Sequence, residues 1–284
     1  MSASSTPLET RFAFGDNWSK FADGVDESAV VIAVNSLRTM LGVESLSGRN
    51  FIDVGCGSGL FSLAARRLGA TVVSFDYDQM SVATTARLRE RIAAGDPAWR
   101  IEQGSVLDRE YVERLGQFDI VYSWGVLHHT GKMWDALRNV TSLIAPHGQL
   151  FISIYNDQGR YSRYWTRIKR LYNRLPRYLR FLVLVPSFVR LRGPMLVRDL
   201  LRGHPLRSWR NYGVERGMSP WYDVVDWVGG YPFEVAKPEE IFDFYRARGF
   251  ELQRMKTCGG GRGCNEYVFA APAQPAEPAD SARS

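Results

Sequence analysis

The sequence lacks several features that would place it outside ordinary globular proteins. It has only three cysteines, Cys56, Cys258 and Cys264, too few for a disulfide framework, which favours a reducing compartment. It has no apolar run of eighteen or more residues, so we expect no transmembrane helix. Residues 1–10 lack the basic start and apolar stretch of a secretory signal. We therefore expect a cytoplasmic protein.

Acidic residues are almost missing from one stretch of the chain. Residues 160–210 contain 14 Lys and Arg but a single acid, Asp199, so this stretch carries +13 in a chain of net charge +6. The rest of the chain carries −7. A basic segment on a mildly acidic body predicts a surface for an anionic partner.

The sequence pattern predicts an α/β fold. Apolar and β-branched runs alternate with helical periodicity, which is typical of a parallel sheet with helices on both faces. The expected strands are Phe51–Val54, Thr71–Phe75, Arg100–Gln103, Phe118–Ser123 and Gln149–Ile154, and the expected helices between them are Leu60–Leu68, Ser81–Ala94 and Met133–Ile144. Two further strands, Glu251–Lys256 and Glu266–Ala270, would form an antiparallel hairpin at the C-terminal end. We expect a Rossmann-like, mostly parallel sheet of seven strands.

At 284 residues, the chain suits one large domain with an insertion. The predicted parts are an N-terminal helical segment (1–47, with a helix at Glu27–Leu41), a cofactor-binding core (48–155), a basic and aromatic helical insert that acts as a lid (156–236), a C-terminal completion of the core (237–271, with a helix at Pro238–Arg248), and a tail (272–284). The tail is rich in Pro and Ala, so we expect it to be disordered.

A glycine-rich loop follows the first expected strand of the core. In Asp53-Val54-Gly55-Cys56-Gly57-Ser58-Gly59, the absence of side chains at Gly55, Gly57 and Gly59 would let a ligand approach the backbone closely. A dinucleotide is one candidate, but its fingerprint needs a glycine where Leu60 stands. A carboxylate at Asp53 would repel a pyrophosphate and suits the ammonium group of an amino acid. A nicotinamide or flavin cofactor and a purely structural turn are the alternatives.

The spacing of this loop resembles motif I of the class I methyltransferases, and the resemblance extends from Phe51 to Ile154. It implies S-adenosylmethionine as the cofactor. Asp76, at the end of the next strand, would accept the ribose hydroxyls. Ser105 stands where the family often has Asp. The residues that the resemblance assigns to the cofactor are Asp53, Gly55, Cys56, Gly57, Gly59, Asp76, Tyr77, Ser105, Val106 and Trp124.

Within that class, the chain resembles the ubiquinone-biosynthesis O-methyltransferases, through the glycine loop, the triplet Leu127-His128-His129 and an insert before the last helix. Those enzymes typically carry Glu at the position of His128, and some carry Glu at that of Gly125 as well. These carboxylates are linked to a metal in part of the family. Because this chain lacks both of them, we expect no metal here. One of the two histidines, preferably His128, would act as general base toward a hydroxyl. The alternative is that the pair only shapes the loop.

A second aromatic and acidic cluster lies between Trp221 and Glu234. Aromatic rings interleaved with carboxylates suit a pocket for a hydroxylated or cationic ligand. We predict a substrate lid with Tyr155, Trp221, Tyr222, Asp226 and Glu234 as acceptor-binding residues. The alternative is a loop that its aromatic residues pin to the domain.

The basic insert predicts an amphipathic helix. Between Tyr161 and Leu175, apolar and aromatic residues form one stripe and arginines another, as in helices that lie in a membrane interface. Phe181–Val185 is apolar but short, and Pro186 interrupts it, whereas Phe188–Leu201 offers further amphipathic helix. The resemblance implies a lid that touches anionic lipid at the inner membrane face and admits a lipophilic acceptor. A solvated basic cover is the alternative, and nucleic acid is not expected as a partner.

The predicted function is therefore O-methylation of a hydroxyl on a lipophilic or secondary-metabolite small molecule. The alternatives are a methyltransferase that acts on nitrogen, carbon, a sugar or RNA, and a membrane-binding protein with a vestigial cofactor fold. The intact set Asp53, Gly55, Gly57, Gly59 and Asp76 argues against the vestigial alternative.

Overall fold

The fold was analysed in a computed structural model. The structure describes residues 12, 15, 18, 22, 24–94, 96–204, 207–209 and 220–273, and the side chains of Pro220 and Tyr222 lie outside that description.

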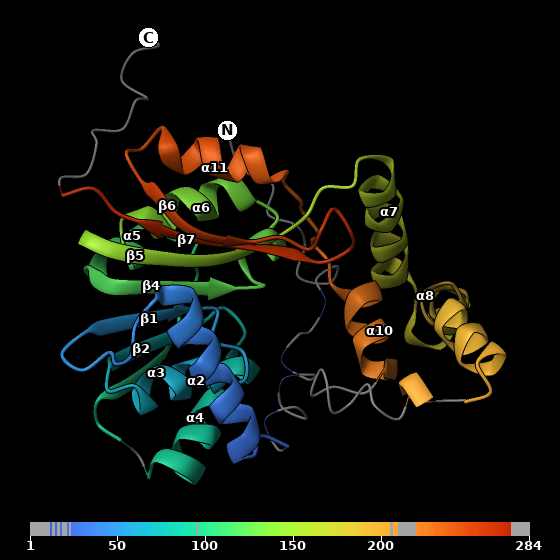
Figure 1. Ribbon diagram of the computed structural model, residues 1–284, viewed down its shortest axis with the longest axis horizontal. Helices are drawn as coiled ribbons and strands as arrows, with labels where there is room; N and C mark the ends of the chain where they lie inside the picture. The colour runs from blue at the N-terminus through green and yellow to red at the C-terminus, as the bar shows by residue number, and fades with distance from the viewer. Residues whose placement is uncertain are drawn as a thin grey trace.

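The core of the molecule is a seven-stranded sheet (Figure 1) with the order β3-β2-β1-β4-β5-β7-β6. The parallel strands are β1 (Asn50–Val54), β2 (Thr71–Asp76), β3 (Trp99–Gln103), β4 (Phe118–Trp124) and β5 (Ile144–Tyr155). The antiparallel strands are β6 (Glu251–Lys256) and β7 (Cys264–Ala270). Because the order reverses from β1 to β4, the carboxyl ends of these two strands form the switch point at which such sheets bind ligands.

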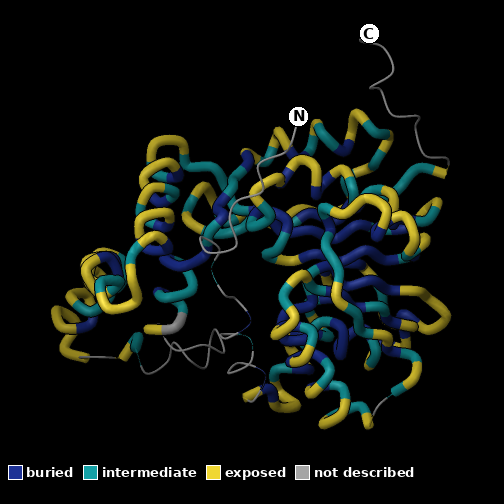
Figure 2. Tube along the Cα trace, turned by 180° about the vertical axis from the view of Figure 1, so that it is seen from behind, coloured by how far each residue is buried: buried dark blue, intermediate teal, exposed yellow. Residues whose placement is uncertain are grey.

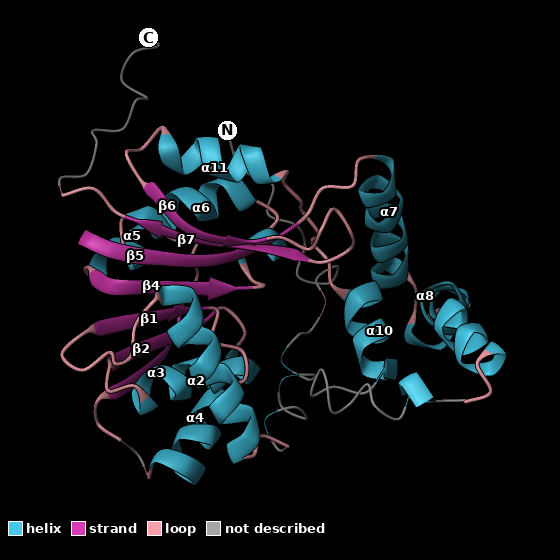
Figure 3. Cartoon of the chain, in the orientation of Figure 1, coloured by secondary structure: helices cyan, strands magenta, loops and turns pink. Residues whose placement is uncertain are grey.

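Helices cover both faces of this sheet, as Figure 3 shows. One face packs against α2 (Glu27–Leu41), α3 (Leu60–Arg67) and α4 (Gln79–Ala93), and the other against α5 (Arg109–Arg114), α6 (Met133–Thr141) and α11 (Pro238–Arg246). Each central strand contributes side chains to the apolar cores on both faces of the sheet, because successive side chains of a strand point to opposite faces. Ile52 and Val54 face α5 and α6, whereas Phe51 faces α2 and α3.

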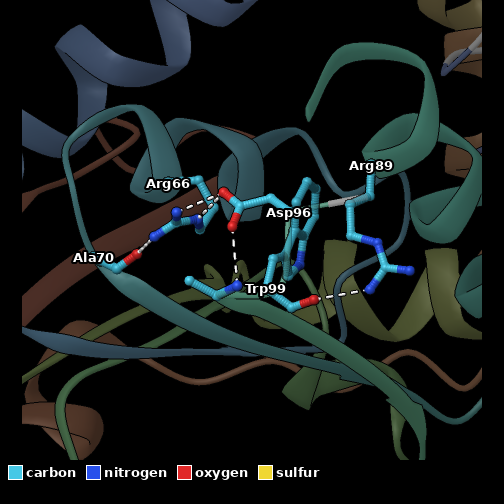
Figure 4. Close-up of polar contacts among 6 residues, drawn as sticks. Arg66, Ala70, Arg89, Asp96 and Trp99 are labelled. Atoms are coloured by element: carbon cyan, nitrogen blue, oxygen red, sulfur yellow. Dashed lines mark hydrogen bonds and ion pairs between the residues drawn. The ribbon is translucent and has the colours of Figure 1, made fainter. Parts of the chain in front are cut away.

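The edge of the sheet at β3 is fixed by arginines from the helices next to it. Arg66 of α3 binds the Asp96 carboxylate with its Nε at 2.8 Å and also donates to the Ala70 carbonyl (Figure 4). Arg89 of α4 donates to the Trp99 carbonyl at 2.9 Å, and the Trp99 ring is fully buried. These contacts hold the turn before β3 and the first residue of that strand in place.

The insert is a separate group of helices at the carboxyl edge of the sheet (Figure 1). It contains α7 (Arg160–Arg174), a 3₁₀ turn (Arg177–Leu179), α8 (Phe181–Leu201) and α10 (Pro220–Gly229). These helices bury an apolar core of their own, made of Trp165, Tyr172, Val183, Leu184, Val224, Val228 and Phe233. Figure 2 shows how much of their outer surface is exposed compared with the strands.

The predicted fold class is confirmed, and three local expectations need correction. The helix expected at Met133–Ile144 ends at Thr141, because Ile144 already begins β5. Pro186 does not interrupt the helix, since α8 continues from Phe181 through Pro186 to Leu201. Val183, Leu184 and Ser187 are buried there, so packing on one side of the helix outweighs the lost hydrogen bond.

The third correction concerns the apolar stripe of α7. Trp165 and Tyr172 from this stripe are buried in the insert's core, and only Tyr164 and Leu171 remain largely exposed. The stripe therefore serves mainly to pack α7 on α8 and α10. Among the helices that the structure describes, none is long and apolar enough to cross a membrane.

Candidate functional site

A large cavity lies where the parallel strands end, between the sheet and the insert. Its volume is about 1320 Å³. Its lining combines the loop after β1, the carboxyl ends of β2, β3 and β4, helix α10, and the turn between β6 and β7. The predicted cofactor-binding and acceptor-binding residues can therefore be compared with the residues that line this one cavity.

The loop after β1 bends sharply because its glycines adopt left-handed backbone conformations. The φ angle is +83° at Gly55, +54° at Gly57 and +80° at Gly59, a region that other residues rarely adopt. Gly55 and Gly57 line the cavity. Gly59 is not among the lining residues: it forms the N-cap of α3, and a Cβ there would lie 2.8 Å from Thr85 Cγ2. The structure thus separates Gly59 from the predicted cofactor residues, and its role is to let α3 pack against α4.

Asp53 provides a buried carboxylate at the end of β1. It is 2% exposed, lines the cavity, and accepts a hydrogen bond of 2.5 Å from Ser62 Oγ, which contacts Ser74 Oγ at 2.7 Å. Burial raises the pKa of Asp53 to about 7, and the nearby Asp76 carboxylate adds to the rise. A cationic ligand group next to Asp53 would restore the ionised form.

Asp76 lies at the end of β2 on the other side of the glycine loop. Its carboxylate accepts hydrogen bonds from the backbone amides of Gly57, at 3.0 Å, and Asp78, at 2.9 Å. Burial raises the pKa of Asp76 to about 6 despite these bonds. The nearby Asp78 caps α4 through the Met80 amide and also lines the cavity.

The remaining predicted cofactor residues also line this cavity. They are Cys56, Tyr77, Ser105, Val106 and Trp124. Cys56 is buried, and burial raises the pKa of its thiol, so it is a packing residue rather than a nucleophile. Trp124 is 43% exposed, and its indole donates to Glu266 Oε1 at 3.3 Å. This bond holds the ring against the wall that β7 contributes.

The two histidines of the 3₁₀ turn Leu127–His129 occupy different environments. His128 is fully buried and is not among the lining residues, and its ring packs on Tyr155 with 4.1 Å between centroids. His129 lines the cavity, and its Nδ1 lies 2.6 Å from the Pro232 carbonyl oxygen. A carbonyl only accepts, so Nδ1 carries the proton and Nε2 is the basic nitrogen. The geometry reverses our preference for His128 and favours His129.

Both histidines are neutral in the folded protein. Burial lowers the pKa of His128 well below its ordinary value, with the neighbouring His129 and Lys169 adding to the effect. Burial lowers the pKa of His129 to about 3. A neutral imidazole is the form that can accept a proton, although a pKa this low makes it a weak base.

The predicted acceptor residues divide into two groups. Tyr155 and Asp226 line the cavity. Trp221 and Glu234 are not among its lining residues. The Trp221 ring packs on Phe188, with 5.5 Å between centroids, and both Glu234 carboxylate oxygens accept from the Met133 amide, at 3.1 and 3.0 Å. Glu234 therefore holds the start of α6 rather than a ligand. Tyr222 lies in α10, and its side chain is outside the described residues.

Several lining residues were missed by the sequence analysis. Asp223 and Trp227 lie on α10, Arg192 on α8, Tyr231 after α10, and Arg262 in the turn between β6 and β7. Arg192 forms an ion pair with Asp223. The aromatic and acidic pattern of the 221–234 cluster carried a signal for Asp223 and Trp227. Nothing local in the sequence marks Arg192, because its partner is 31 residues away.

The charges of the lining decide between the candidate cofactors. Near the glycine loop the described lining offers the carboxylates of Asp53 and Asp76. The basic side chains that the structure describes in the lining, Arg192, Lys256 and Arg262, come from α8 and the β6–β7 hairpin. A diphosphate would lie against carboxylates, whereas an ammonium group and a ribose diol find acceptors. The site fits S-adenosylmethionine and disfavours a dinucleotide. Among the described residues, no group of three His, Cys, Asp or Glu could hold a metal ion.

Comparisons with known proteins agree with this description. A family model described as a methyltransferase domain matches residues 33–184, just over half of the chain. The chain is 33% identical over 112 residues to a ubiquinone biosynthesis O-methyltransferase of Pseudomonas entomophila, covering 39% of this chain and 47% of that protein. It is 32% identical over 151 residues to the protein of the same name from Xanthomonas campestris, covering 53% of this chain and 61% of that protein. The chain thus spans about half the length of the curated relatives it matches.

Solved structures show the same fold at low sequence identity. Magnesium protoporphyrin IX methyltransferase of Synechocystis PCC 6803, solved with bound S-adenosylhomocysteine, matches with a TM-score of 0.53 and 14% identity over 91% of this chain and 95% of that one. An O-methyltransferase family protein of Burkholderia thailandensis matches with a TM-score of 0.53 and 13% identity over 92% of this chain and 59% of that one.

Proposed function

Because this chain belongs to the family of methyltransferase domains, we propose that it transfers the methyl group of S-adenosylmethionine to a hydroxyl of a lipophilic small molecule. The observation that carries the proposal is a single cavity with Asp53 and Asp76 at the glycine loop and a neutral His129 in the same lining. We also propose that residues 156–236 act as the lid of this cavity, which is supported by the separate apolar core of the insert.

Each end of the cofactor has a partner in this assignment. The Asp53 carboxylate would bind the ammonium group, and the Asp76 carboxylate would accept the ribose hydroxyls, while Ser105 and Val106 would lie beside the adenine. When bound, S-adenosylmethionine supplies an electrophilic methyl group on a positively charged sulfur. The tight glycine loop and the aromatic walls orient the reactants, and orientation accounts for much of the rate in such a transfer.

His129 would serve as the proton acceptor. Its Nδ1 is held by the Pro232 carbonyl, which fixes the ring and leaves Nε2 as the basic nitrogen. As the acceptor oxygen forms its new bond to carbon, the hydroxyl proton would pass to Nε2, and the bond between carbon and sulfur breaks. Tyr155 and Trp227, which pack edge to face 5.5 Å apart, would provide apolar walls for a lipophilic acceptor.

Calorimetric titration with S-adenosylhomocysteine tests the cofactor assignment. We expect micromolar or tighter binding that Asp76→Ala weakens by at least about tenfold, as expected when a buried charged hydrogen bond is lost. NAD should not compete. Tight NAD binding without binding of the adenosyl-sulfur ligand would overturn the proposal.

The base assignment is tested with methyl-labelled S-adenosylmethionine and a lipid extract, with labelled products followed by mass spectrometry. His129→Gln should lower product formation by about 100-fold, the lower range for a general base, without changing the affinity for S-adenosylhomocysteine. The matched control is His147→Asn, an exposed histidine of β5 that does not line the cavity. Unchanged product formation in His129→Gln would show that His129 is not the general base.

We further propose that the outer surface of the insert contacts anionic lipid. The 3₁₀ turn and α8 expose apolar residues, with Tyr178 at 74%, Phe181 at 56% and Leu182 at 55%. Four exposed arginines of the insert, Arg163, Arg167 and Arg174 on α7 and Arg177 in the 3₁₀ turn, form no ion pair with the residues that the structure describes. Apolar side chains next to unpaired arginines are typical of surfaces that insert into the headgroup region.

Sedimentation with mixed vesicles of phosphatidylcholine and anionic phosphatidylglycerol tests this contact, with vesicles of phosphatidylcholine alone as the uncharged control. The wild-type protein should bind at low salt, whereas R163E/R167E/R174E should not. F181S/L182S should weaken binding with little change in its salt dependence. Wild-type protein that stays in the supernatant at low salt would reject the proposal.

A further inference from the structure

Two residues near the N-terminus belong to the lining of the cavity. Phe12 and Trp18 line it, although the rest of the lining begins at Asp53 in the chain. No local sequence pattern connects these two residues to the glycine loop.

Trp18 packs directly on the glycine loop. A Cβ placed on Gly57 would lie 3.3 Å from Cε2 and Nε1 of the Trp18 indole. Gly57 is therefore covered by an aromatic ring on the side where its own side chain would point. The indole is partly buried and faces the same cavity as Asp53 and Asp76.

Gly15 fixes this part of the chain to helix α4. Its amide donates to Asp78 Oδ2 at 3.0 Å, while Asp78 Oδ1 accepts from the Met80 amide at 2.9 Å. A Cβ on Gly15 would lie 2.5 Å from Asp78 Oδ2 and 2.6 Å from Met80 Cβ. Only glycine fits at this position without displacing the residue that caps α4.

The same part of the chain also reaches the insert. The Phe12 amide donates to the Tyr231 carbonyl at 3.0 Å, and a Cβ on Gly229 would overlap the Phe12 ring. On the other side of Trp18, Arg91 Nη2 donates to the Ala22 carbonyl at 2.7 Å. The contacts of Phe12, Gly15, Trp18 and Ala22 therefore join the lid, the glycine loop and helix α4.

We infer that Trp18 is a cofactor-binding residue and that Gly15 positions it through Asp78. The inference rests on the proposed function, since it assumes an adenosyl-sulfur ligand in the cavity. An indole face suits both a flat heteroaromatic ring and a positively charged sulfur. Covering the glycine loop with this ring also removes water from beside the buried carboxylates. The N-terminal residues thus complete a site that the Rossmann-like core supplies only in part.

Titration of W18A with S-adenosylhomocysteine tests the inference. We expect the Kd to rise by up to about tenfold relative to the wild type, as for the loss of one aromatic contact to the adenine ring. The matched control is W134A: Trp134 is 37% exposed on α6, packs on Phe244, and does not line the cavity. G15V should also raise the Kd, although it keeps the indole.

Thermal unfolding without ligand separates binding from a purely structural role. If Trp18 only stabilised the fold, W18A would lower Tm and leave the Kd unchanged, which would overturn the inference. If W18A does not fold, W18F keeps a smaller ring and G15V keeps the indole. Wild-type affinity in both of these variants would overturn the inference equally. A wild-type protein that does not bind S-adenosylhomocysteine would instead reject the proposed function.

Discussion

The sheet and the helical insert use apolar residues in opposite ways. Phe51, Ile52 and Phe151 of the sheet are fully buried, whereas α8 of the insert leaves Leu200 67% and Leu201 82% exposed. Figure 2 shows buried strands beside more exposed helices of the insert in the part of the chain that the structure describes. The sheet is therefore stabilised by its apolar core, while the insert has a small core and a large apolar outer surface that its own packing does not use.

The two regions also differ in their buried polar groups. Between the sheet and α3, Asp53, Ser62 and Ser74 form a continuous hydrogen-bonded chain behind the glycine loop. In the insert, Lys169 Nζ donates to the Trp227 carbonyl and lies 4.4 Å from the centre of the Trp227 ring, and Asn173 Nδ2 donates to the Gly229 carbonyl at 2.7 Å. These two side chains fix the C-terminal end of α10. Buried polar contacts therefore add to the small apolar core of the insert in holding its helices together.

The largest expected effect comes from removing a phenylalanine ring from the sheet and, for comparison, from the insert. Phe151→Ala removes a fully buried ring of β5 and should lower the free energy of unfolding by about 3–5 kcal/mol. Phe181→Ala removes the same ring from the surface of α8, where it is 56% exposed, and should change that free energy by no more than about 0.5 kcal/mol. Urea unfolding measures both. A comparable loss in the two variants would mean that the Phe181 ring is buried in solution.

The second prediction concerns Asp53. Its pKa is about 7 in the fold and 3.8 in the unfolded chain, so the folded state binds more protons between these values. Stability of the unliganded protein from this group is fully present below about pH 4 and is lost as the pH rises to 7. A shift of this size corresponds to roughly 2–4 kcal/mol. Asp53→Asn should therefore be more stable than the wild type at pH 8 and bind S-adenosylhomocysteine more weakly.

Urea unfolding of the ligand-free protein at pH 5 and pH 8 measures the effect. The difference between Asp53→Asn and the wild type should be large at pH 8 and small at pH 5. Asp78→Asn serves as the control, because Asp78 lies beside the same loop but caps α4. If Asp53→Asn keeps the wild-type pH dependence, Asp53 ionises normally in the fold.

The same contrast explains which features could be predicted from the sequence. Asp53 and Asp76 lie at the ends of strands whose periodicity is local, and Gly55 and Gly57 follow the first of these strands, so their meeting at one sheet edge follows from the order of the elements. His128 and His129 are neighbours in one 3₁₀ turn, and only tertiary packing decides which ring faces the cavity. Pattern alone also misplaced Trp221 and Glu234, whose partners Phe188 and Met133 lie far away in the chain.

Two residues that no pattern marked also make their contacts across long separations in the chain. Gly15 meets Asp78 across 63 positions, and Lys169 meets Trp227 across 58. A lysine at position 169 looks from the sequence like one more charge on the basic face of α7. In the structure it is fully buried, because the carbonyl and rings at the end of α10 accept its ammonium group.

Lys169 gives the smallest and most specific prediction, since it is the insert's counterpart of Asp53 with the opposite sign. Burial lowers its pKa from 10.5 to about 7. The unfolded chain therefore binds more protons between pH 7 and 10.5, and this lysine makes the protein more stable as the pH rises through that window.

Lys169→Met should change the free energy of unfolding by no more than about 1 kcal/mol at pH 7, because the loss of one hydrogen bond offsets the gain from no longer burying an amine. At pH 9.5 the wild type should gain on the variant by about 1–2 kcal/mol. Arg167→Met, an exposed neighbour on α7, should show no such change, and an equal pH response in both variants would mean that Lys169 is solvated and that polar contacts do not fix the end of α10.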